Sequence, residues 1–211
     1  MGWVGGTGAA LGVAGAAILA WTAAGRTPRA VDPGFDSFVA GWRRAHRIPD
    51  GPREPGGRVT LAWLRVPWAV GVVLARRGVD PDRLTACALW LALAAGWTAA
   101  LGPGWAAGAG ALTLLAGVAD GVDGAVAVLE RRTSAFGAVW DSTADRLADL
   151  AMVAGPVALV ATRAPDPRPA LAAGAAAAAA GLLSEYVRAR AQATGVVAAW
   201  TLVTPGERPA R

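Results

Sequence analysis

The sequence predicts an all-α protein, an integral membrane helical bundle with about five transmembrane helices and an interfacial juxtamembrane helix. Three observations support this class. Hydrophobic residues make up 55% of the 211 residues, the mean hydropathy is positive, and several apolar runs approach the roughly 20 residues that a helix needs to cross a bilayer. A soluble domain with one buried core is therefore excluded. The single cysteine, Cys87, excludes a disulfide framework.

The first element is a Gly- and Ala-rich apolar run at residues 8–24. It lacks the charged region that begins a secretory signal, so it is expected to stay uncleaved. Residues 1–24 are therefore interpreted as an N-terminal membrane anchor helix. Residues 25–58 are polar and rich in Pro, Gly and Arg, which is typical of a linker.

The next segment, residues 59–77, is apolar but is interrupted by Arg65 and Pro67. It is too broken for a clean span. We expect an interfacial helix on the cytoplasmic leaflet instead.

Four apolar segments near spanning length follow, at residues 84–102, 106–130, 137–162 and 170–191. All 20 basic residues are arginines, and they concentrate before residue 84, in the loop at 130–136 and after residue 187. Because cytoplasmic loops of membrane proteins carry an excess of basic residues, these places are expected on the cytoplasmic side. Two arginines in the loop at 162–169 weaken this bias without reversing it. The net charge of +5 thus indicates membrane topology, and no nucleic-acid partner is expected.

Four carboxylates interrupt the apolar sequence at regular spacing. Asp120 and Asp123 stand at i and i+3, and Asp141 and Asp145 at i and i+4, so each pair projects from one face of its helix. The arginine-based topology brings both pairs toward the cytoplasmic end of their helices. Four anions this close require cations, and hard divalent ions prefer carboxylate oxygen. The pattern therefore predicts a centre with two metal ions.

The spacing resembles the signature of the CDP-alcohol phosphotransferase family, D-x-x-D-G-x-x-A-R followed by eight residues and G-x-x-x-D-x-x-x-D. Seven positions match, namely Asp120, Asp123, Gly124, Ala127, Gly137, Asp141 and Asp145. One departs, because Val128 stands where the family carries arginine. Arg131 and Arg132 are close enough in sequence to substitute in part.

The resemblance implies transfer of a phosphatidyl group from CDP-diacylglycerol to a polar alcohol, with release of CMP. It implies two Mg2+ or Mn2+ ions bound by Asp120, Asp123, Asp141 and Asp145, with Asp145 as the base that activates the acceptor hydroxyl. It also implies that the donor's CDP group contacts Asp120, Gly124, Ala127 and Gly137. The glycines would let the nucleotide approach the backbone. Close helix packing is the alternative explanation for them.

Two further segments narrow the resemblance. G-V-D-P-D-R-L-T at residues 78–85 is similar to the segment that precedes the first core helix in the family, with Thr85 or Asp82 expected as its N-cap.

E-Y-V-R-A-R-A-Q at 185–192 and G-E-R-P-A-R at 206–211 resemble segments of bacterial phosphatidylinositol phosphate synthases. That resemblance implies an acceptor-phosphate site formed by Arg188, Arg190, Arg208 and Arg211, and inositol phosphate as the favoured acceptor. Anchoring of a helix end on the cytoplasmic side explains the arginines equally well. Glu185 stands where those synthases carry serine, and its charge would oppose an anionic acceptor unless it is neutralised.

Other interpretations stay open. Residues 59–211 are expected to form the catalytic membrane domain, but this domain is C-terminally short, since the family continues with two more helices. This shortness and Val128 favour a non-catalytic relative that binds a lipid-nucleotide or acts as a membrane scaffold. Intramembrane carboxylates also occur in ion pathways. Small residues at 170–181 allow close packing between helices and thus a homodimer. The expected location is the bacterial cell membrane, with the active site toward the cytoplasm.

Overall fold

The computed structural model describes residues 12–18, 20–21, 31, 34–45, 57–132 and 134–194. Within these ranges every regular element is a helix, which confirms the all-α prediction. Residues 12–18 and 20–21 are helical, and the later elements are α2 (Phe35–Ala45), α3 (Gly57–Arg76), α4 (Pro81–Leu101), the short 3₁₀ helix η1 (Pro103–Trp105), α5 (Ala106–Leu129), α6 (Ala135–Ala161) and α7 (Arg168–Ala193).

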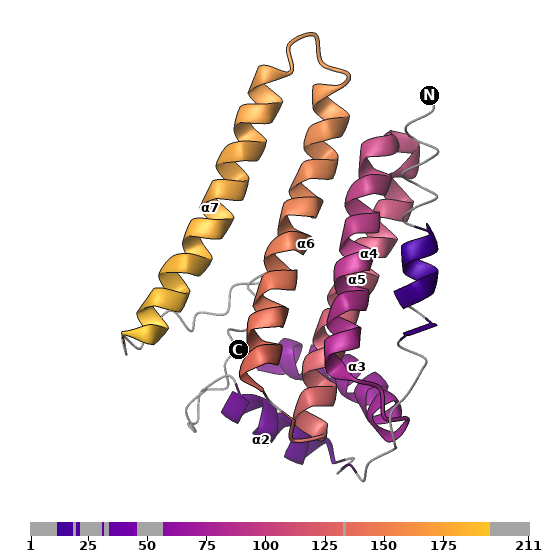
Figure 1. Cartoon of the computed structure of the whole chain (residues 1–211), viewed down its shortest axis with the longest axis vertical. Helices are drawn as coiled ribbons and strands as arrows, with labels where there is room; N and C mark the ends of the chain where they lie inside the picture. Colours follow the sequence, from indigo (N-terminus) through magenta and orange to yellow (C-terminus); the bar gives the residue numbers. More distant parts are fainter. Residues whose placement is uncertain are drawn as a thin grey trace.

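Helices α4 to α7 run up and down beside one another, and α2 and α3 lie at one end of them (Figure 1). We call this the basal end; it holds α2, α3, the start of α4, the end of α5, the start of α6 and the end of α7. Among the described helices, α4 packs on α5 and α6, α3 packs on α5, and α7 packs on α6. The alternating direction brings both halves of the aspartate pattern toward the basal end.

Four of the described helices are long and apolar enough to cross a membrane, over Val59–Arg76, Pro81–Leu101, Pro103–Leu129 and Arg168–Ala191. Three of them correspond to predicted spans. The first covers the segment expected to be interfacial, because Arg65 and Pro67 do not shorten its helix. The predicted span at 137–162 does form a helix, α6, but falls outside this group since it carries Asp141, Asp145, Arg146 and Asp149. The described part of the predicted N-terminal anchor is too short to test it as a span.

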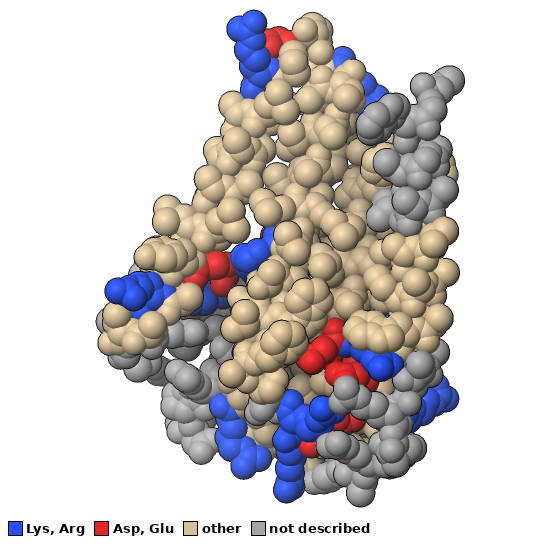
Figure 2. Space-filling model, in the orientation of Figure 1, with Lys and Arg blue, Asp and Glu red and all other residues tan. Residues whose placement is uncertain are grey.

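Charged side chains follow the same axis. In Figure 2 a broad uncharged band lies below the upper end of the visible face, arginines and acids appear from about mid-height down to the basal end, and a smaller charged group lies at the opposite end. That smaller group includes the exposed ion pair between Arg168 and Asp166 in the connection before α7. An uncharged band around part of a helical bundle is what the hydrocarbon core of a bilayer requires.

Two glycines set the distance between α4 and α6. A Cβ atom on Gly96 would lie 2.3 Å from the carbonyl oxygen of Ala151, and one on Gly155 would lie 2.2 Å from that of Gly96. The two backbones are thus in direct contact, which no larger residue permits. Buried Ala92 and Ala148 continue this contact toward the basal end. The aspartates of α6 are therefore held close to α4.

The starts of α4 and α6, both at the basal end, have side-chain caps. Asp80 caps α4 by accepting from the backbone N–H of Asp82 at 3.1 Å, so the expectation of Thr85 or Asp82 as the cap was wrong. The reason is that Pro81 begins the helix, a position that proline favours. Ser134 caps α6 by accepting from the N–H of Gly137 at 2.9 Å.

The main core lies at the basal end, between α2, α3, α4 and α5. Phe38, Leu64, Leu84 and Val126 are among its buried members. This core fixes the end of α5, the helix that carries the first aspartate pair.

Candidate functional site

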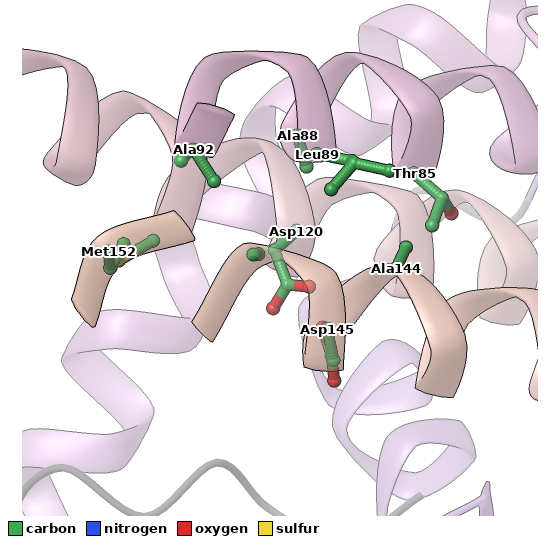
Figure 3. A pocket seen from close by; sticks show the side chains of 10 residues that line it. Thr85, Ala88, Leu89, Ala92, Asp120, Ala144, Asp145 and Met152 are labelled. Atoms are coloured by element: carbon green, nitrogen blue, oxygen red, sulfur yellow. The ribbon is translucent and has the colours of Figure 1, made fainter. Parts of the chain in front are cut away.

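Three of the four predicted carboxylates converge. One oxygen each from Asp120, Asp141 and Asp145 lie within 4.8 Å of one another. Asp120 comes from α5 and the other two from α6, one helical turn apart. Asp141 is buried, with 5% of its surface exposed, whereas Asp120 and Asp145 are half-buried. Figure 3 shows Asp120 and Asp145 beside one another on neighbouring helices.

Asp123 lies outside this group. It is 2% exposed, and one of its carboxylate oxygens accepts a hydrogen bond from the hydroxyl of Thr85 on α4. The other oxygen accepts from the backbone N–H of Gly124. Three positions on a helix are about 60° apart in rotation. Asp120 therefore faces α6 while Asp123 faces α4.

The three-carboxylate group has the chemistry of a divalent cation site. Oxygen ligands lie about 2.0–2.6 Å from Mg2+ or Ca2+, so two ligands of one ion are about 4–5 Å apart at most. The separation of 4.8 Å is within this limit. A small cavity of about 10 Å³ is bordered by Asp120 and Asp145, with apolar residues such as Ala88 and Met152 around it. Such a cluster could bind a divalent cation at a partly buried position between α5 and α6.

A larger cavity of about 270 Å³ opens at the basal end between the starts of α4 and α6. It is lined by Asp80, Pro81, Asp82, Arg132 and Ser134. The indole N–H of Trp140 on α6 donates to the backbone carbonyl of Asp82 at 3.1 Å, which ties the two helix starts together.

Gly137, in the first turn of α6, lies where these helix starts meet. A Cβ atom on it would lie 3.0 Å from Ser134 Oγ and 3.3 Å from Asp82 Oδ1. A side chain at this position would therefore crowd both groups. Gly124 and Ala127 lie on α5, partly buried.

Val128, the departure from the family pattern, packs against the basal core. A Cβ on Gly41 of α2 would lie 2.8 Å from its Cγ1 atom, so α2 covers this position closely. The two nearby arginines differ. Arg131 is exposed, whereas Arg132 is partly buried, lines the larger cavity and pairs with Glu130 at 3.5 Å.

The two predicted acceptor arginines that the structure describes do not share one face. Arg188 and Arg190 are two positions apart on α7, which is about 200° in rotation. Arg188 pairs with Glu185 at 3.3 Å, while Arg190 is exposed. Arg208 and Arg211 lie outside the described residues.

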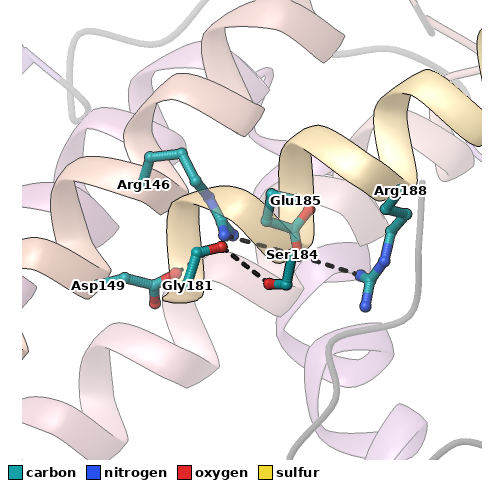
Figure 4. A network of polar contacts seen from close by, with 6 residues as sticks. All are labelled: Arg146, Asp149, Gly181, Ser184, Glu185 and Arg188. Carbon is teal, nitrogen blue, oxygen red and sulfur yellow. Dashed lines mark hydrogen bonds and ion pairs between the residues drawn. The ribbon is translucent and has the colours of Figure 1, made fainter. Parts of the chain in front are cut away.

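A polar network joins α6 to α7 (Figure 4). Arg146, next to Asp145 in the chain, pairs with Asp149 at 3.2 Å and with Glu185 at 3.6 Å. Sequence reasoning did not place Arg146 beside Glu185, because a contact between two helices depends on their relative rotation. The bond between Thr85 and Asp123 was missed as well, although the threonine belongs to the segment at 78–85 that the sequence singles out.

Comparisons with known proteins find sequences similar to this chain. The family model for CDP-alcohol phosphatidyltransferase matches residues 78–204. Archaetidylinositol phosphate synthase of Methanothermobacter thermautotrophicus is 36% identical over 140 residues, which cover 63% of this chain and 68% of that protein. The bifunctional IPC transferase and DIPP synthase of Rubrobacter xylanophilus is 39% identical over 115 residues, 54% of this chain and 25% of that protein. No solved structure matches.

Proposed function

The chain belongs to the CDP-alcohol phosphatidyltransferase family of enzymes, and from this membership we propose that it transfers a phosphatidyl group from CDP-diacylglycerol to a polar alcohol with release of CMP. The substrates of the family are CDP-alcohol donors and alcohol acceptors. The apolar helices and the family together make the chain an integral membrane protein. The specific donor and acceptor are our proposal.

One observation carries the proposal most directly, the convergence of Asp120, Asp141 and Asp145 within 4.8 Å. We propose that these carboxylates bind Mg2+ or Mn2+, with Asp123 as a further ligand where a second ion is bound. Bound divalent ions neutralise the negative charge that develops on a leaving phosphate.

The chain's own residues would then act on the acceptor. Asp145 takes the proton of the acceptor hydroxyl as the hydroxyl oxygen attacks the phosphorus of the donor's phosphatidyl group. The new phosphorus–oxygen bond forms as the bond between that phosphorus and the oxygen of CMP breaks. The half-buried position of Asp145 keeps its carboxylate within reach of a solute.

The larger cavity at the starts of α4 and α6 supports a donor site at the basal end. We propose that Asp120, Gly124, Ala127 and Gly137 border the CDP group, and that Arg132 supplies the positive charge that Val128 cannot. The crowding around Gly137 supports its role, because a side chain there would narrow this cavity.

Inositol phosphate is the acceptor we favour, because one relative is named as an archaetidylinositol phosphate synthase. Arg188, with Arg208 and Arg211, is the candidate contact for its phosphate, whereas Arg190, also predicted from the sequence, leaves α7 on another face. We further propose that the basal end faces the cytoplasm of a bacterial cell, since most described arginines gather there. Small-residue surfaces on α7 would suit a homodimer.

The test is CMP release from CDP-diacylglycerol by the purified full chain in detergent. We expect release with Mg2+ and inositol phosphate, no release with EDTA, and loss in Asp145→Asn. Asp166→Asn removes an exposed charge at the opposite end and should leave release unchanged. Release that persists in EDTA or in Asp145→Asn would contradict the proposed mechanism.

Val128 favours a second candidate, a relative that binds the donor without catalysis. Its side chain packs under α2 where the family pattern has a cation. In that case the folded protein would bind CDP-diacylglycerol but release no CMP with any acceptor tested, including inositol phosphate and glycerol phosphate.

A further inference from the structure

Two arginines from different helices converge on a single oxygen atom. Nη1 of Arg146 on α6 lies 3.6 Å from Oε1 of Glu185, and Nη1 of Arg188 on α7 lies 3.3 Å from the same atom. In Figure 4 the Glu185 side chain lies between the two guanidinium groups. An anion in this position is bound by positive groups from both sides.

The position is accessible to a solute. The side chains of Arg146, Glu185 and Arg188 are 23%, 30% and 36% exposed. A small anion could therefore compete with the Glu185 carboxylate. Guanidinium groups bind phosphate at least as well as carboxylate, through the same N–H donors.

The network is electrically balanced as it stands. Arg146 and Arg188 contribute two positive charges, and Asp149 and Glu185 contribute two negative ones. Loss of the Glu185 charge would leave one positive charge uncompensated. That excess would attract an anion and would have little effect on a neutral polyol.

The anion position also lies at the same level of α6 as the three-carboxylate group. Arg146 directly follows Asp145, whose carboxylate belongs to the three-carboxylate group. On one helix, adjacent residues have Cα atoms only about 3.8 Å apart, while their side chains leave the helix in directions about 100° apart. An acceptor with a hydroxyl at Asp145 would therefore reach Arg146 and Arg188 by extending its phosphate around the side of α6.

We propose that Glu185 is a specificity residue whose carboxylate occupies the phosphate position between Arg146 and Arg188, so that a phosphorylated acceptor binds only by displacing it. This inference rests on the proposed function, which supplies the acceptor class. Glu185 thereby weakens the binding of phosphorylated alcohols relative to neutral ones.

The test is equilibrium binding of inositol phosphate, inositol and inorganic phosphate to the full chain in detergent with Mg2+. In Glu185→Gln, which keeps the shape and removes the charge, the Kd for inositol phosphate should fall about tenfold, since each of two partly exposed ion pairs contributes a fraction of a kcal/mol to about one. The Kd for inositol should stay the same. Glu185→Asp, which keeps the charge, and Asp166→Asn, which removes a charge elsewhere, should bind like the unchanged chain. Glu185→Ser replaces Glu185→Gln if the latter does not fold.

An unchanged or higher Kd for inositol phosphate in both neutral variants would overturn the inference. An equal gain for inositol, or no saturable binding by any variant, would overturn it as well. Binding is measured without turnover, so the outcome is separate from CMP release. An inactive chain whose Kd falls in Glu185→Gln would refute the proposed function and leave this site standing.

Discussion

Replacement of Thr85 by valine tests how Asp123 is held. The Thr85 hydroxyl has one proton and two acceptors within reach, the Asp123 carboxylate and the carbonyl of Pro81 at 3.2 Å. The carboxylate is the stronger acceptor because it is charged. Thr85 is 5% exposed and Asp123 is 2% exposed, so no bulk water replaces a lost bond.

The magnitude follows from this geometry. Valine has nearly the shape of threonine, so Thr85→Val removes the hydrogen bond without opening a cavity. A hydrogen bond to a charged group contributes about 1.5–3 kcal/mol to stability, and we expect a loss of about 2 kcal/mol in the free energy of unfolding. Thr85→Ser keeps the hydroxyl and removes one methyl group, which costs about 1 kcal/mol.

The assay is denaturant unfolding of the purified protein in detergent, followed by circular dichroism. The free energy of unfolding should be highest with threonine at position 85, lower with serine and lowest with valine. Combining Thr85→Val with Asp123→Asn should reveal a coupling of about 1 kcal/mol or more between the two positions. A Thr85→Val variant as stable as the unchanged chain would refute the hydrogen bond between Thr85 and Asp123. Additive effects of the two substitutions in the double variant would refute it as well.

Three other substitutions test the packing and the donor site. Gly96→Ala should lower the free energy of unfolding by about 1–3 kcal/mol, because the added methyl group would press on the α6 backbone. The control is Gly110→Ala, where an added Cβ meets nothing. This variant should raise the free energy of unfolding by about 0.5–1 kcal/mol. Equal effects in unfolding assays would disprove the close contact. Arg132→Ala should raise the KM for CDP-diacylglycerol about tenfold, and Arg131→Ala should raise it much less, because of these two arginines only Arg132 lines the larger cavity. Initial rates of CMP release measure both KM values. Equal KM values for the two variants would contradict the prediction. Val128→Arg should loosen α2 and speed its cleavage in limited proteolysis, whereas unchanged cleavage would show that arginine fits beneath it.

The sequence was sufficient for the helix order and for the placement of three of the four acids. Long apolar runs predicted the helices, and alternating direction placed Asp120 near Asp141 and Asp145. These inferences depend on spacing along one helix, which the chain itself determines.

Contacts between helices were harder to predict, because they depend on rotation and distance. Asp123 was expected beside the other three acids, yet its bond to Thr85 turns it toward α4. The approach of α6 to α4 depends on Gly96 and Gly155, 59 positions apart in the chain, and neither belongs to a recognised motif. The pairing of Arg146 with Glu185 likewise follows from how α7 lies against α6.

The central claim is that Asp120, Asp141 and Asp145 bind the divalent ion on which CMP release depends. Its most direct test is Mn2+ binding, followed by electron paramagnetic resonance, in the same detergent samples that are assayed for CMP release. We predict saturable Mn2+ binding by the unchanged chain, and loss of both binding and release in Asp141→Asn, with Asp166→Asn as the matched control. Mn2+ binding that survives in Asp141→Asn, or CMP release without any divalent ion, would contradict the account.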